Sequence, residues 1–353
     1  MISIQNRITA FAKLGDYLSQ FSIDNIKKID NIEHNEIFFD GFLHQIKLAE
    51  ENNSWFTKEN VIFSLNTISK SLTESNLKSF TESFSLTTSS SKNVAIIMAG
   101  NIPLVGFHDF LSVLISGHSV LIKQSSNDKH LLPYLAKYLE YVEQDFKGKI
   151  TFTEEKLTDF DAIIATGSDN TARYFEYYFK NKPNIIRKSR NSVAVISGNE
   201  TEDDFIKLSD DIFQYFGLGC RSVSKLFVPK NYNFDLFFSG MFAKRDMIKN
   251  AKYANNYDYN KAVYLMSLYD LLENGFLMIK EDQSYSSPIA TVFYEYYEDE
   301  ITLKRKLEQD KEKIQCIVAK DFIEGEIAFG QTQQPSLTDY ADGVNTLEFL
   351  SKI

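Results

Sequence analysis

The sequence predicts an α/β protein with two lobes, each built on a largely parallel sheet. A helical region at the N-terminus precedes the first lobe. A continuous apolar run at 94–98 is typical of a strand buried on both faces of a parallel sheet. Strand and helix patterns then alternate to about residue 318, which is the rhythm of βαβ units. At 353 residues the chain is long enough for two such lobes.

Residues 1–90 are predicted to form a helical region packed on the first lobe. Their apolar side chains recur at spacings of three and four, which marks one face of a helix, at Ile8, Phe11, Leu14, Leu18 and Phe21. The Ser/Thr/Asn-rich stretch 85–93 has the composition of a linker.

Residues 91–198 are predicted to form the first lobe, and a boundary is expected near Gly198. Its helices are expected at 107–115, 129–141 and 170–179. Its strands are expected at 94–98, 119–123, 161–166, near Ile185 and at 193–196.

Residues 199–328 are predicted to form the second lobe, which opens on a helix with an acidic, cap-like start at 201–215. Further helices are expected up to residue 272 and at 300–311, and strands at 224–228, 276–279, 291–294 and 316–318. The remaining segment, 329–353, is a candidate oligomerisation arm.

Composition excludes several classes of protein. A formal charge of −10 disfavours a broad nucleic-acid-binding face. The two cysteines lack the spacing of a structural zinc site or disulfide framework. The N-terminus lacks the pattern of a signal peptide, and the longest apolar region, 94–122, is too polar for a membrane span. We therefore expect a cytoplasmic enzyme without a bound metal.

Cys220 is the strongest candidate for a catalytic nucleophile. It follows Gly217 and Gly219 and precedes an apolar strand-like run. Glycines allow unusual backbone angles and leave space beside the sulfur, so the thiol is open to attack a carbonyl carbon. A small buried thiol in the core is the alternative that the local sequence leaves open.

Familiar catalytic and nucleotide-binding motifs are missing or misplaced. The chain has no GxxxxGK[ST] loop, and the string at 217–222 lacks the third glycine of a dinucleotide loop. Ser222 and Lys225 match the S-x-x-K string of serine acyl-enzymes, but on a predicted strand rather than a helix. None of the five histidines is close to Cys220 in sequence.

Five separated segments together resemble the acyl-CoA reductases of the aldehyde dehydrogenase superfamily, the group that contains the reductase subunit of bacterial luminescence. They are Ala-Gly-Asn-Ile-Pro at 99–103, Gly-His-Ser-Val-Leu-Ile-Lys at 117–123, Ala-Thr-Gly-Ser at 165–168, Gly-Cys-Arg-Ser at 219–222 and the glutamine-rich string at 330–343. The resemblance runs from about residue 90 to the end. It implies that 91–198 is a Rossmann-like, nicotinamide-binding lobe and 199–328 is the catalytic lobe.

The resemblance also implies residue roles. Cys220 would be the nucleophile, and the side-chain amide of Asn101 would stabilise the oxyanion, unless Asn101 is only a turn former. Lys123 would contact the cofactor ribose, with Ser125 beside it at the end of the same strand. Gly167 and Ser168 would meet the pyrophosphate at a helix N-terminus, or serve only as a helix cap.

The chain departs from the superfamily pattern at two places. Aldehyde-oxidising members carry a glutamate base at the end of the cofactor lobe, whereas this chain has Arg-Lys-Ser-Arg-Asn-Ser at 187–192. Without that base, water is poorly activated and an acyl-enzyme can wait for hydride. Ser126 stands where NAD-preferring relatives often carry glutamate, so a 2′-phosphate would not be repelled and NADPH is favoured over NADH.

The sequence therefore predicts NADPH-dependent reduction of a long-chain fatty acyl-CoA to the aldehyde through a Cys220 thioester. A redox-inactive acyltransferase or acyl carrier that uses the same cysteine remains an alternative. A pseudoenzyme subunit of a fatty-acid reductase assembly is another. A homo-oligomer is expected, with an acyl-transfer or synthetase subunit as a candidate partner. Phe213, Phe216, Phe237 and Phe238 are candidates for either substrate lining or core.

Overall fold

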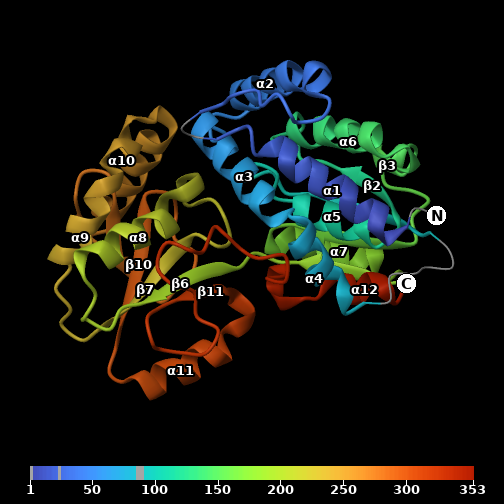
Figure 1. Cartoon of the computed structure of the whole chain (residues 1–353). Helices are drawn as coiled ribbons and strands as arrows, with labels where there is room; N and C mark the ends of the chain where they lie inside the picture. The colour runs from blue at the N-terminus through green and yellow to red at the C-terminus, as the bar shows by residue number, and fades with distance from the viewer. Residues whose placement is uncertain (1–2, 23–24, 85–90) are drawn as a thin grey trace. The chain divides into compact units, whose positions relative to one another are not determined.

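The structure, a computed structural model, describes residues 3–22, 25–84 and 91–353 (Figure 1). The chain folds into two compact units: unit 1 comprises Met1–Lys188 and Ser336–Ile353, and unit 2 comprises Ser189–Pro335. The division thus falls after Lys188 and not near Gly198. The reason is that the strand β6 (Asn191–Val195), expected to close the first lobe, pairs with strands of unit 2.

The N-terminal part of unit 1 is helical, as the spacing of its apolar residues predicted. It forms α1 (Ile4–Leu18), α2 (Asn35–Asn52), α3 (Lys58–Ser71) and α4 (Glu74–Glu82). Ser3, Thr57 and Thr73 each accept a backbone N–H at a helix start, which satisfies donors that the helix leaves unpaired. Most of the linker-like stretch, residues 85–90, lies outside the described residues.

Unit 1 contains a five-stranded sheet in the order β3-β2-β1-β4-β5, and every pair in it is parallel. The strands are β1 (Asn93–Ile97), β2 (Ser119–Lys123), β3 (Ile150–Phe152), β4 (Ala162–Thr166) and β5 (Asn184–Arg187). β3 was not expected, because it is three residues long and its side chains are only half-buried or exposed. The chain adds strands on one side of β1 and then on the other, so the order reverses beside β1.

Alternating side chains of the sheet enter two separate cores. Val94 and Ile96 pack among the N-terminal helices, whereas Ala95 packs with Phe175 and Phe179 on the opposite face. This alternation follows from the two-residue period of a strand. The first face is covered by α1–α4, α5 (Phe107–Ile115) and α6 (Leu131–Val142), and the second by α7 (Asp169–Phe179) (Figure 1).

The C-terminal residues return to unit 1. Leu347 and Leu350 of α12 (Thr346–Ser351) are fully buried in the same core as α1 and α5. The rings of His108 and His118 bond the carbonyl oxygens of Leu337 and Leu350 at 2.9 and 3.0 Å. These buried leucines are unavailable to a subunit contact, so a role of 329–353 in assembly stays a prediction for its exposed residues.

Unit 2 has a six-stranded sheet in the order β11-β6-β7-β10-β9-β8, in which only β8 pairs antiparallel. The remaining strands are β7 (Val223–Pro229), β8 (Leu272–Glu273), β9 (Met278–Glu281), β10 (Thr291–Tyr297) and β11 (Ile314–Val318). The helices are α8 (Glu202–Phe213), α9 (Asp235–Met241), α10 (Ala251–Met266) and α11 (Glu300–Gln309).

For two helices of unit 2, α8 and α11, the sequence features that stabilise them can be named. α8 begins with a capping box, in which Thr201 and Asp204 each bond the other's backbone N–H. α11 buries Leu303 and Leu307 against Val193 and Phe227 of the sheet. α8 leads directly into the loop that carries Cys220.

Candidate active site

The carboxyl edge of the unit 1 sheet gathers the predicted cofactor residues. Because all five strands are parallel, their carboxyl ends lie at the same edge. The strand order reverses between β1 and β4, and this is where open α/β sheets bind ligands. The residues that follow β1, β2 and β4 at this edge are Asn101, Lys123, Ser125, Gly167 and Ser168.

The turn that carries Asn101 is fixed by two buried polar side chains. Asn101 is exposed, whereas Leu104 lies in the left-handed region with φ 58°. Asp128 accepts the Leu104 N–H at 2.7 Å, and the Ser64 hydroxyl donates to the Pro103 carbonyl at 2.9 Å. Burial raises the pKa of Asp128 to about 6, although the Leu104 N–H favours the carboxylate. Asp128 therefore holds the backbone at Leu104, three residues after Asn101.

Lys123 and Ser125 lie where β2 ends, beside the end of β1. The Lys123 ammonium donates to the Glu155 carbonyl at 3.0 Å. A Cβ at Gly100 would lie 2.5 Å from the Ser125 hydroxyl oxygen, so only glycine fits there. The two strand ends are therefore in direct contact.

Gly167 and Ser168 form the transition from β4 to α7. The Ser168 hydroxyl caps α7 by accepting the Thr171 N–H at 3.4 Å, so the helix-cap role is present. A Cβ on Gly167 would lie 3.0 Å from the side chain of Thr171. The glycine therefore allows the end of β4 to lie close to the first turn of α7. A helix start of this kind offers N–H groups and a positive dipole end to an anion.

Cys220 is exposed and lies just before β7, in a loop with unusual backbone angles. Tyr215, Phe216 and Gly217 all have positive φ, at 56°, 59° and 75°. Bulky residues avoid this region, and such strain is concentrated at functional sites. The Ser192 hydroxyl of β6 donates to the Cys220 carbonyl at 2.9 Å, which fixes the loop to the sheet. Cys316, in contrast, is buried in β11.

The place of the absent glutamate is occupied by cations with other partners. Arg187 at the end of β5 is buried and pairs with the buried Asp109, and it also donates to the Thr346 hydroxyl at 3.1 Å. Lys188 pairs with Glu176 at 2.8 Å. Asp109 is thus held in an ion pair with Arg187 inside unit 1.

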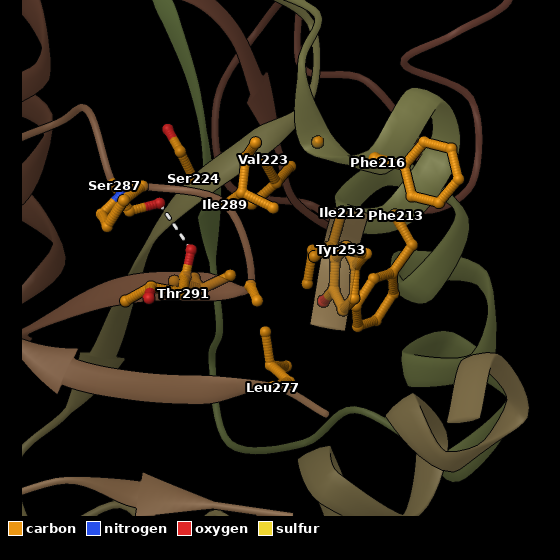
Figure 2. Close-up of a pocket in the computed structure, with 14 residues that line it drawn as sticks. Ile212, Phe213, Phe216, Val223, Ser224, Tyr253, Leu277, Ser287, Ile289 and Thr291 are labelled. Carbon is orange, nitrogen blue, oxygen red and sulfur yellow. Dashed lines mark hydrogen bonds between the residues drawn. The ribbon is translucent and has the colours of Figure 1, made fainter. Parts of the chain in front are cut away.

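A small, partly open hollow lies in unit 2 beside the Cys220 loop, between α8, α10 and the segment before β10. Gly217 and Val223, which flank the loop on either side, both line it. Figure 2 shows the rings of Phe213, Phe216 and Tyr253 gathered on one side and the hydroxyls of Ser224 and Ser287 on the other.

The four phenylalanines that the sequence indicated as substrate lining or core do not share one environment. Phe213 and Phe216 line this hollow, but Phe237 is fully buried and packs against Phe205, Phe234 and Phe238 in the core.

Within residues 3–22, 25–84 and 91–353, no group of three or more His, Cys, Asp or Glu side chains is placed to hold a metal ion. No helix in the same part of the chain is long and apolar enough to cross a membrane.

The family model of acyl-CoA reductase (LuxC) matches residues 16–266. The chain belongs to this acyl-CoA reductase family. The prediction of the family from five short motifs is therefore confirmed, and the match also includes most of the N-terminal helices, which resembled the family only loosely in sequence. At the family level, the activity is aldehyde-forming reduction of an acyl group by an oxidoreductase. No curated protein matches the chain.

Solved aldehyde dehydrogenases share the fold of this acyl-CoA reductase. Aldehyde dehydrogenase 21 from Physcomitrella patens, in complex with succinate, is 12% identical with a TM-score of 0.67, covering 100% of this chain and 84% of its own. The NAD+ complex of an aldehyde dehydrogenase from Bacillus cereus is 12% identical with a TM-score of 0.60, covering 90% and 72%. An Escherichia coli NADP dependent enzyme is 10% identical with a TM-score of 0.62, covering 90% and 73%. The predicted aldehyde dehydrogenase-like fold is thus confirmed.

The structure adds two carboxylates that the motifs did not indicate, Asp128 in unit 1 and Asp211 in unit 2. Both are buried and accept backbone N–H groups near a predicted functional residue. Their sequence contexts, after Asn127 and after Asp210, are those of ordinary surface residues. Among the predicted residues, the cofactor set and Asn101 lie in unit 1 and Cys220 lies in unit 2.

Asp128→Asn should change how stability depends on pH. The pKa of Asp128 is raised from 3.8 to about 6 in the folded protein, so the folded state holds its proton longer. Wild-type stability from this group is therefore greatest below pH 4 and falls as pH rises toward 6–7, by up to about 3 kcal/mol at 1.36 kcal/mol per pH unit. Urea unfolding from pH 4 to 8 should show the wild type losing stability relative to Asp128→Asn.

The control is Asn127→Ala, an exposed neighbour of Asp128 without an ionisable side chain, and its curve should stay parallel to that of the wild type. Parallel curves for Asp128→Asn as well would contradict the burial of an ionisable Asp128.

Proposed function

We propose that this acyl-CoA reductase converts a fatty acyl-CoA into the aldehyde with NADPH, through an acyl thioester on Cys220. The observation that carries the proposal is the exposed Cys220 in a loop entered through three left-handed residues, in a chain of this family. A thiol in this setting is accessible, and its backbone is held by Ser192, which suits covalent catalysis.

In the first half-reaction, the Cys220 thiolate attacks the thioester carbonyl carbon of the acyl-CoA. A C–S bond to Cys220 forms, the carbonyl oxygen becomes negative, and the intermediate collapses with loss of the CoA thiolate. We assign the Asn101 side chain as a donor to that oxygen. One such donor is worth about 10²–10³ in rate when it is fixed in place, and Asp128 and Ser64 fix this turn.

In the second half-reaction, the thioester carbon would receive hydride, which NADPH would supply when bound. The C–S bond to Cys220 would then break, the aldehyde would leave and Cys220 would return to the thiolate, while the released CoA thiolate takes up a proton from solvent. The residues at the carboxyl edge of unit 1 fit such a cofactor. The Gly167–Ser168 start of α7 offers N–H groups to the pyrophosphate. The Lys123 ammonium uses one donor on Glu155 and has two others for a ribose.

We attribute retention of the thioester to the lack of the glutamate base that aldehyde-oxidising relatives carry. Arg187 and Lys188 replace the glutamate of aldehyde-oxidising relatives, and both are paired with carboxylates. Water then lacks a base at this position, so hydrolysis of the acyl-enzyme is slow and reduction competes effectively.

The acyl chain is assigned to the hollow beside the Cys220 loop. Its lining combines apolar side chains such as Ile212 and Phe213 with the hydroxyl-bearing Ser224 and Ser287. An apolar chain gains about 0.8 kcal/mol for each CH₂ removed from water. The apolar side chains there therefore favour the methylene groups of the acyl chain that lie nearest the thioester.

NADPH oxidation with acyl-CoAs of increasing length tests the proposal. Wild-type kcat/KM should rise with chain length, Cys220→Ala should be inactive, and Asn101→Ala should lower kcat by about 10²–10³-fold. Asn6→Ala, at an exposed position of α1, serves as a matched control for Asn101.

Full activity of Cys220→Ala would overturn the covalent mechanism. Acyl labelling of the wild type without any NADPH or NADH oxidation would instead favour the redox-inactive acyltransferase.

Ser126→Glu should reverse the cofactor preference. Ser126 is exposed after β2, and a carboxylate there would repel a 2′-phosphate and accept the ribose hydroxyls of NADH. We expect kcat/KM for NADPH to fall by about tenfold or more, with NADH unchanged or improved. Ser126→Gln has the same length without the charge and should leave the ratio within about twofold. An unchanged NADPH/NADH ratio in Ser126→Glu would place the 2′-phosphate elsewhere.

A further inference from the structure

Asp211 is a fully buried carboxylate in the last turns of α8, the helix that leads to Cys220. One oxygen accepts the Gly330 N–H at 2.6 Å. The other accepts both the N–H and the hydroxyl of Thr332, at 2.9 and 2.8 Å. Burial raises the pKa of this carboxyl to about 6, and these donors oppose the rise. Three bonds therefore attach residues 330–333 to α8.

The same four-residue segment also holds the Cys220 loop. The Thr332 carbonyl accepts the Arg221 Nε–H at 2.5 Å, and the Gln333 amide donates to the Ser222 hydroxyl at 3.3 Å. Thr332 is fully buried, and Ser222 and Gln333 are nearly so. Arg221 and Ser222 directly follow Cys220, so the segment connects Asp211 to the loop through consecutive hydrogen bonds.

The backbone at Gly330 allows the segment to lie against α8. Its φ is 81°, in the left-handed region that favours glycine. A Cβ there would lie 3.2 Å from the Cβ of Lys207 on α8. This accounts for the glycine that opens the glutamine-rich string at 330–343, a motif for which the catalytic residues alone give no reason.

We propose that Asp211 is a positioning residue for Cys220 that acts through residues 330–333. It fixes Thr332, Thr332 fixes Arg221, and Arg221 fixes the backbone on the carboxyl side of the nucleophile, while Ser192 holds the Cys220 carbonyl from β6. A buried carboxylate is costly, and here its lone pairs are met by three donors that must all be in place. The inference rests on the proposed role of Cys220 as the nucleophile.

Asp211→Asn is the most direct variant, because it keeps the size of the side chain but turns an NH₂ group toward a backbone N–H. We expect the single-turnover rate of Cys220 acylation by acyl-CoA, followed by intact mass, to fall by about tenfold or more. The KM for acyl-CoA should change by no more than about threefold, because a positioning role lowers kcat rather than substrate binding.

Asp210→Asn is the matched control. Asp210 is adjacent on α8, is half exposed and pairs with Lys244 rather than with residues 330–333. Its acylation rate should equal that of the wild type.

Arg221→Met provides a second variant in case Asp211→Asn folds poorly. It removes the Nε donor to Thr332 and leaves Asp211 intact, and it should slow acylation to a similar degree. In the double variant the two effects should not add, because both act through Thr332.

The outcomes separate the two proposals. Wild-type acylation rates in folded Asp211→Asn and in Arg221→Met would overturn the positioning role and leave the Cys220 mechanism intact. Additive losses in the double variant would also contradict a shared path through Thr332. A wild-type protein that is never acylated would instead overturn the proposed function itself.

Discussion

The reversal of strand order beside β1 is the constraint on which the rest of unit 1 depends. A parallel sheet needs a crossover connection between neighbouring strands, and here the crossovers α5 and α7 lie on opposite faces. The loops after β1 and β4 then diverge, and the carboxyl edge between them stays open for a ligand. The same edge carries the Asn101 turn, so the fold presents the proposed oxyanion donor and the cofactor residues together.

In both units a buried carboxylate holds the backbone near a residue that we propose as functional. Asp128 accepts a backbone N–H just after Asn101, and Asp211 accepts three donors from the segment that binds the Cys220 loop. Each carboxylate has a raised pKa because it is buried, which is a cost to stability. Each carboxylate also fixes the backbone near Asn101 or Cys220, and the proposed reactivity of these two residues depends on their orientation. The left-handed Tyr215 and Phe216 add strain that the surrounding core must oppose.

The sequence predicted the elements that have strong local patterns. It did not predict which sheet a strand joins, because that depends on pairing with strands far away in the chain. β2 and α5 were placed to the residue, because Gly117 and the apolar runs define their ends. β6 was assigned to the wrong side of the boundary, since an apolar strand does not specify which sheet it joins. Short motifs led to the prediction of Cys220 and the cofactor residues, and their roles remain predictions. Asp128 and Asp211 could not be found this way, because their roles arise only when distant backbone amides reach them.

Intact-mass measurement of the protein after incubation with a long-chain acyl-CoA, without and then with NADPH, tests the central claim most directly. The account predicts a mass increase of one acyl group that persists in buffer, maps to Cys220 and disappears as aldehyde when NADPH is added. Absence of any acyl adduct, or an adduct on Cys220 that NADPH does not discharge, would contradict it.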